Sequence, residues 1–277
     1  MDYKTLRREI ENIDTLPTLP GILNKLLKVI ENPRVSLKEI GSFISNDPVL
    51  TSRILRAVNS PIYGFPGRIA SINQSLVLLG LNVVRGLLLG VSVFEAMKKG
   101  LEGLWEHSVG CATVARIMAQ KIGFKEPEEV AVAALLHDIG KVILSLKFPK
   151  EYRQVLKVVA AKNQSVYEGE KDFFEVSHAE VGGLIAQRWH FPPALVDIID
   201  YHHQPHLSRE VPQMTAIVHL SDILIRGRGF GFAGDTHVPA VNTRAWDLLN
   251  LSEKDLKDIL NELEDSLEMV GDFLVLD

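Results

Sequence analysis

The sequence predicts an all-α protein. Apolar residues recur every three or four positions through most of the chain, which is the period of an amphipathic helix. Serine capping motifs and prolines separate these stretches, and the few β-like runs are too short to build a sheet. A chain of 277 residues forms one large domain or two modest ones. It can bury a sizeable core without disulfides.

The first hundred residues read as a compact helical unit. Residues 18–31 carry leucine and isoleucine at helical spacing. Ser36 and Glu39 form a capping-box pattern that opens the next helix. Pro48 is suited to the first turn of the helix after it, which we expect to stop near Pro61.

A loop is expected over residues 61–70, after which Ser71 caps a further helix. The most apolar stretch of the chain follows at residues 76–94 and has the length of a membrane span. Asn82 and Arg85 lie in its middle, however, and a central arginine costs at least ~2.5 kcal/mol on insertion. We therefore interpret this stretch as a core helix or helix pair rather than a membrane segment.

A second helical unit follows, with no internal repeat or flexible linker between the two units. We expect an N-terminal subdomain over residues 1–100 and a second subdomain over residues 101–277, packed tightly together. The C-terminal 27 residues contain nine acids and form an amphipathic closing helix or, alternatively, a helix that binds a partner. The other helices are predicted at roughly 104–122, 126–144, 149–163, 177–190, 192–203 and 211–226.

A glycine-rich loop is predicted at residues 227–243. Gly229, Gly231 and Gly234 match the spacing of a dinucleotide-binding fingerprint. The segment follows a predicted helix rather than a strand, and no βαβ unit surrounds it. We therefore interpret it as a surface loop that uses glycine for tight turns.

Charge and cysteine content indicate which binding partners and which cellular compartment to expect. A net charge of -5 disfavours a broad surface for nucleic acid, although Arg53, Arg56, Arg68 and Arg85 leave a local patch as a minor alternative. The single cysteine excludes a disulfide framework and fits a reducing cytosol. The charged N-terminus does not resemble a signal peptide, so we expect a cytoplasmic protein.

The strongest signal for chemistry is the pair His137 and Asp138. The pair follows the apolar run VAVAALL, on a helix that must be largely buried. A buried carboxylate needs a partner, and a divalent metal shared with neutral imidazoles would supply one. Lys141 lies one turn beyond His137, where it could contact a phosphate.

Other candidate ligands lie on separate predicted helices and could converge inside a bundle. They are His107, His178, the pair His202 and His203, and Asp222. Each also has a structural reading, as a hydrogen-bonded core residue, a helix C-cap or a backbone acceptor. Cys111 lies one turn after His107 and is either a small core residue or a thiolate ligand. The histidines without such context, expected to be structural or exposed, are His190, His206, His219 and His237.

The order of these residues resembles the HD superfamily of metal-dependent phosphohydrolases. More closely, roughly residues 12–235 resemble the HDOD domain, a relative of the HD-GYP phosphodiesterases that hydrolyse cyclic di-GMP. The motifs that carry the resemblance are LPTLPGILNKLLKVIENP, ISNDPVLTSRILRAVNSPIYG, LLHDIGK, HAEVGGLIAQRWHFP, YHHQP and GFGFAGD.

The resemblance implies an HD-type helical bundle and a role in bacterial signalling. It further implies one or two divalent transition-metal ions (Fe, Mn, Zn, Ni or Co), bridged by Asp138 or Asp222, with Lys141 and Asp138 as catalytic residues in an active enzyme. The implied metal ligands are His107, His137, Asp138, His178, His202, His203 and Asp222.

Two departures guide the choice of function. Gln204 and Pro205 stand where the phosphodiesterases have a glutamate and a GYP signature, and Gly103 stands where some relatives place a further carboxylate. These differences favour a metal-binding regulatory module with a protein partner or a nucleotide ligand. The alternative is a metal-dependent phosphohydrolase acting on a nucleotide or a cyclic dinucleotide.

Overall fold

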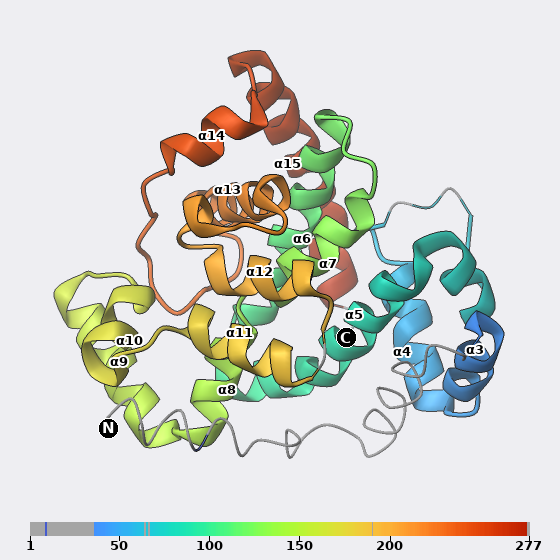
Figure 1. Cartoon of the computed structure of the whole chain (residues 1–277), viewed down its shortest axis with the longest axis horizontal. Helices are drawn as coiled ribbons and strands as arrows, with labels where there is room; N and C mark the ends of the chain where they lie inside the picture. Colours follow the sequence, from blue (N-terminus) through green and yellow to red (C-terminus); the bar gives the residue numbers. More distant parts are fainter. Residues whose placement is uncertain (1–8, 10–35, 64, 66, 190, 276–277) are drawn as a thin grey trace.

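The computed structural model describes residue 9 and residues 36–275, apart from positions 64, 66 and 190. The described part of the chain is helical and contains no strand, which confirms the all-α prediction (Figure 1). None of its helices is both long enough and apolar enough to cross a membrane. The helix expected at residues 18–31 lies outside the described residues.

The first described helices begin where their capping residues predict. Helix α3 (Leu37–Ser45) opens on the capping box of Ser36 and Glu39, and Pro48 is the first residue of α4 (Pro48–Val58). Helix α5 (Ile72–Gly100) is capped by Ser71, whose hydroxyl accepts a hydrogen bond from the Gln74 N–H at 3.1 Å. Its helical conformation is interrupted at Gly80, where φ is 79°, so the apolar stretch forms a helix pair.

Helix α6 (Leu104–Lys121) runs through the centre of the molecule (Figure 1). Every residue of this helix from His107 to Ala115 is buried. It packs mainly against α7 (Pro127–Leu136), α13 (Pro212–Arg228) and α15 (Glu253–Val275), and also contacts α5. A polar side chain on this part of α6 therefore faces the interior and needs a partner there.

The predicted helix 126–144 is in fact two helices that meet at His137 and Asp138. Helix α7 ends at Leu136, and α8 (Ile139–Lys147) begins after a two-residue turn. Helix α8 approaches α11 (His178–Arg188) so closely that a Cβ at Gly140 would lie 1.8 Å from the His178 carbonyl oxygen. The His-Asp pair thus lies at a junction between helices rather than along one of them.

The remaining elements surround these helices. Helices α9 (Pro149–Lys162) and α12 (Pro193–Tyr201) follow the predicted positions, and the short 3₁₀ turn Pro205–Leu207 after α12 was not predicted. Helices α10 (Val166–Phe174) and α14 (Thr243–Leu249) were not predicted. The amphipathic C-terminal helix α15 is confirmed, because it buries Leu263 and Leu267 in a core cluster with residues of α6 and leaves Leu260 partly exposed.

Candidate metal centre

The structure brings all seven predicted ligands together in the interior. They come from α6 (His107), the α7–α8 junction (His137 and Asp138), α11 (His178), the end of α12 (His202 and His203) and α13 (Asp222). All of them are buried except His203, which is half-buried. Their nitrogen and oxygen atoms fall into two adjacent groups, each compact enough to hold a metal ion.

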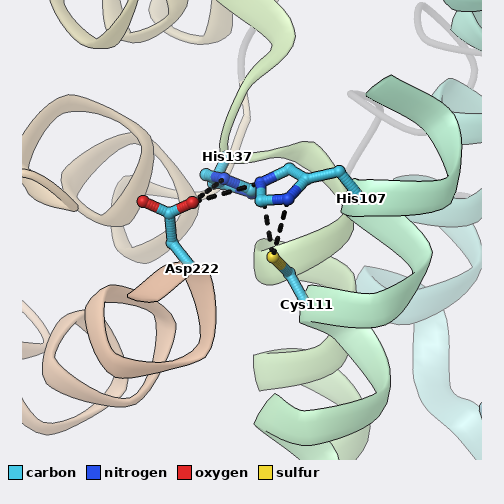
Figure 2. A group of neighbouring side chains, drawn as sticks. All are labelled: His107, Cys111, His137 and Asp222. Carbon is cyan, nitrogen blue, oxygen red and sulfur yellow. Dashed lines mark hydrogen bonds and ion pairs between the residues drawn. The ribbon is translucent and has the colours of Figure 1, made fainter. Parts of the chain in front are cut away.

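The first group combines His107, His137 and Asp222 with Cys111 (Figure 2). The ligand atoms of these residues all lie within 4.8 Å of one another. Asp222 Oδ1 is 3.1 Å from His107 Nε2 and 4.0 Å from His137 Nε2. Two imidazoles from different helices therefore point at one carboxylate oxygen.

The second group consists of Asp138, His178, His202 and His203. The Nε2 atoms of His178 and His203 are only 2.9 Å apart. Two imidazole nitrogens hold such a distance through one shared proton or through a common cation. The ring centroids of His202 and His203 lie 4.2 Å apart, so this pair is part of the same cluster rather than a simple helix cap.

Asp138 connects the two groups. Its Oδ2 atom lies 3.4 Å from His137 Nε2 and 3.7 Å from His107 Nε2. Its Oδ1 atom lies 3.2 Å from His178 Nε2 and 3.8 Å from His202 Nε2. The carboxylate thus presents one oxygen to each group, which is the arrangement of a bridging ligand.

Hydrogen bonds to backbone carbonyls fix the orientation of two imidazoles. His137 Nδ1 donates to the Ala134 carbonyl at 2.6 Å, and His202 Nδ1 donates to the Ile199 carbonyl at 2.8 Å. A carbonyl only accepts, so in each neutral ring Nδ1 carries the proton and Nε2 keeps a lone pair. These lone pairs point into the cluster, as they do in metal-bound histidines.

Three atoms in the cluster lack hydrogen-bond partners within the described part of the chain. They are His137 Nε2, His202 Nε2 and Asp138 Oδ1, and each is buried. Leaving a buried polar atom unpaired costs about 1–3 kcal/mol, and more for a charged group. A divalent transition metal bound by imidazole nitrogen and carboxylate oxygen would satisfy all three, so the residues fit such an ion.

Two buried cations accompany the carboxylates. Lys141 Nζ lies 2.7 Å from Asp138 Oδ2, and Arg226 Nε lies 2.7 Å from Asp222 Oδ1. Burial alone would raise the pKa of Asp138, but His137 and Lys141 outweigh it and hold that pKa well below its usual range. Both carboxylates are thus ionised, because Arg226 outweighs burial in the same way and lowers the pKa of Asp222. Lys141 itself is completely buried against Asp138.

The imidazoles differ in charge. Burial lowers the pKa of His137, and it lowers that of His202 and His203 much further. Burial would also lower the pKa of His178, but Glu170 outweighs it, and the net shift is upward. The neutral form is the one in which a histidine binds metal.

Two supporting carboxylates were missed by sequence reasoning. Glu170 on α10 accepts from His178 Nδ1 at 2.6 Å and from the Tyr152 hydroxyl at 2.8 Å. Asp235 accepts from Arg226 Nη1 at 2.9 Å and so holds the cation that faces Asp222. The sequence does carry a signal for the helix that holds Glu170, because Ser165 and Glu168 form a capping box that opens α10.

Of the four histidines expected to be structural or exposed, the three that the structure describes belong to neither group of candidate ligands. His219 Nδ1 donates to the His202 carbonyl, and its Nε2 accepts from the Asn242 N–H, so both ring nitrogens are satisfied. His206 and His237 are exposed. The fourth, His190, falls outside the described residues.

The glycine-rich loop packs on the start of α6 rather than on a strand. Gly231 has a φ of 68°, and a Cβ there would lie 2.2 Å from the His107 backbone nitrogen. The Phe232 N–H donates to the Gly103 carbonyl at 2.8 Å. The glycines therefore permit a close approach that positions the helix carrying His107.

Comparison with known proteins agrees with this architecture. The profile of the HDOD domain family matches residues 16–205. The chain belongs to the HDOD family. An HDOD domain protein of unknown function from Geobacter sulfurreducens is 30% identical and superposes with a TM-score of 0.74, over 98% of this chain and 96% of that one.

Two further relatives extend the comparison. A protein from Shewanella amazonensis, named as a candidate phosphohydrolase, is 23% identical with a TM-score of 0.66, over 96% of this chain and 97% of its own. At that identity the likeness shows a common fold. An uncharacterised protein of Treponema pallidum (strain Nichols) is 28% identical over 221 residues, or 78% of this chain. The HDOD chain spans only 43% of the length of that relative.

Proposed function

We propose that this HDOD chain is a metal-binding regulatory module of a bacterial cytoplasm that holds one or two divalent transition-metal ions in its buried cluster. The observation that carries the proposal is the set of three unpartnered atoms, His137 Nε2, His202 Nε2 and Asp138 Oδ1. Each is a good ligand atom without a hydrogen-bond partner among the described residues, and Asp138 Oδ1 has only the His178 imidazole beside it, at 3.2 Å.

The carboxylates of the cluster support a bound cation. Asp138 and Asp222 supply two buried carboxylates that face the cluster, each beside one buried cation, Lys141 or Arg226, while Glu170 pairs with His178. Ions bound at both groups would be shared through Asp138, which offers one oxygen to each. In this arrangement Glu170 holds His178 and Arg226 holds Asp222, so both act as outer-shell supports.

Burial favours a regulatory role over turnover. Six of the seven ligand residues are buried, so a phosphate ester has no direct route to most of the ligand atoms. A sealed metal site instead stabilises one conformation of the fold, because ion binding selects the state in which the five ligand-bearing segments are assembled. We propose that a protein partner or a nucleotide ligand binds selectively to this conformation.

A phosphohydrolase is the second candidate, and Lys141 beside the bridging Asp138 favours it. When bound, a divalent metal polarises phosphoryl oxygens and lowers the pKa of water. Lys141 would be released from Asp138 to contact the phosphate. The name of the Shewanella relative points to the same class of reaction.

Elemental analysis of protein purified without chelator tests the metal-binding proposal. We expect near-stoichiometric transition metal in the wild type and its loss in His137→Ala. The matched control is His206→Ala, which removes an exposed histidine outside the cluster and should retain the metal. A wild type that carries no metal and binds none on reconstitution contradicts the proposal.

A hydrolysis assay separates the two candidates. The metal-loaded protein is incubated with cyclic dinucleotides and with a chromogenic phosphodiester. The regulatory proposal expects no turnover above that of the Asp138→Ala variant. Turnover by the wild type that is abolished in Asp138→Ala would establish the enzyme instead.

A further inference from the structure

We propose that Cys111 is a thiolate ligand of the first metal position, which gives that position the four ligands His107, Cys111, His137 and Asp222 in addition to the bridging carboxylate of Asp138. This inference rests on the proposed function, because it names a ligand of the same metal centre. It goes beyond the ligand set that the resemblance implies, which contains only histidine and aspartate.

The helix geometry places the thiol at the centre of the group. Cys111 follows His107 by one turn of α6, so the two side chains lie on the same face of that helix. Figure 2 shows the sulfur next to the His107 imidazole, with contacts drawn to both ring nitrogens, and Asp222 and His137 beside the same ring. Cys111 Sγ lies 4.0 Å from His107 Nδ1 and 3.5 Å from His107 Nε2.

The 3.5 Å between Cys111 Sγ and His107 Nε2 matches the separation that a shared metal ion would impose. Metal–sulfur and metal–nitrogen bonds of about 2.3 and 2.0–2.1 Å at a tetrahedral angle place the two ligand atoms about 3.5 Å apart. Asp222 Oδ1, at 3.1 Å from the same nitrogen, is close to the corresponding nitrogen–oxygen separation. Two of the three separations among these ligand atoms are thus close to those expected around one ion, and all three atoms lie within 4.8 Å of one another.

A second observation points to an ion at this place. His137 belongs to the same group, and its Nε2 atom is buried with no hydrogen-bond partner among the described residues. The thiol cannot satisfy the cluster as a thiol, because it has a single weak proton to donate. An ion among the four residues satisfies His137 and replaces that proton, which is released to solvent when the metal–sulfur bond forms.

Four protein ligands have two consequences for the chemistry. A site closed by four side chains has the character of a structural metal position, whereas a catalytic position keeps one place open. A thiolate also favours soft or borderline ions such as Zn²⁺ and Co²⁺ over Mn²⁺ and Mg²⁺. The first position therefore stabilises the fold. Any ligand exchange or catalysis would take place at the second group.

Cobalt loading tests the assignment directly. The full-length protein, stripped of metal and reconstituted with Co²⁺, is expected to show a thiolate-to-cobalt charge-transfer band in the near ultraviolet. The chain has one cysteine, so the band reports Cys111 alone. Cys111→Ser should abolish the band and shift metal preference toward Mn²⁺. Thr113→Ala, which removes a buried hydroxyl of the same helix bonded to the Val109 carbonyl, should keep it.

The wild-type spectrum decides the matter even where a variant folds poorly. Protein that binds cobalt stoichiometrically without a thiolate band overturns the role of Cys111 and leaves the metal-binding proposal intact. Protein that binds no cobalt at all overturns both. X-ray absorption of the zinc-loaded protein gives the same decision, since the inference requires one sulfur at about 2.3 Å.

Discussion

Glu170 Oε2 lies 2.6 Å from His178 Nδ1, in a pair that is completely buried. The same carboxylate oxygen accepts the His178 backbone N–H at 2.6 Å. This double contact fixes the ring and directs its Nε2 toward Asp138 and His203. A carboxylate that orients a histidine in this way is a recurrent support for metal ligands.

Loss of that support is expected to weaken metal binding without abolishing it. Glu170→Gln removes the charge that holds His178, so we expect metal affinity to fall about 10–100-fold. Competition against a chelator measures the change. Asp172→Asn alters an exposed carboxylate on the same helix and should leave the affinity unchanged. Equal affinities for wild type and Glu170→Gln would place the metal elsewhere.

Replacement of Arg226 is expected to destabilise the fold. It is buried between Asp222 and Asp235 at 2.7 and 2.9 Å. Arg226→Ala leaves both carboxylates without their cation, which typically costs about 3–5 kcal/mol in the free energy of unfolding.

Urea unfolding of metal-free protein measures this cost. The control is Arg228→Ala on the same helix, which breaks an exposed pair with Glu264 and should leave the midpoint nearly unchanged. Similar midpoints for the two variants would show that the charges around Asp222 are compensated in another way.

Removal of metal should lower the melting temperature. An ion that binds only the folded state stabilises it by about 2.7 kcal/mol at a free concentration 100 times its dissociation constant. Thermal unfolding with and without chelator should therefore differ in the wild type and coincide in His137→Ala. A wild-type melting temperature that changes neither with chelator nor with added metal would be inconsistent with the proposed site.

The glycine loop is expected to matter through the backbone of α6. In Gly231→Ala the alanine would adopt a left-handed φ, and its Cβ would clash with the His107 backbone nitrogen. We therefore expect the free energy of unfolding to fall by about 2–4 kcal/mol. Gly227→Ala has open space around the new methyl group and should be neutral or slightly stabilising. Denaturant unfolding of both variants provides the check, and equal stabilities would show that the loop does not constrain α6.

Sequence reasoning found the ligands because each lies on or beside an apolar helical segment. Helical period alone could not show that α7 ends before His137, since the turn there depends on the close approach of Gly140 to α11. Glu170 was missed although the Ser165 capping box marks the start of its helix, because its contact with His178 depends on tertiary packing. The pairing of Arg226 with Asp222 and Asp235 depends on tertiary packing, which no local pattern encodes.

A crystal structure of the metal-loaded protein, measured at the absorption edge of the metal, tests the central proposal most directly. We expect an anomalous difference peak within about 2.0–2.3 Å of His137 Nε2, His202 Nε2 or an oxygen of Asp138. Two such peaks on either side of Asp138 would correspond to the two groups. Peaks confined to exposed histidines such as His206 and His237, with none in the buried cluster, would contradict the assignment of a metal centre.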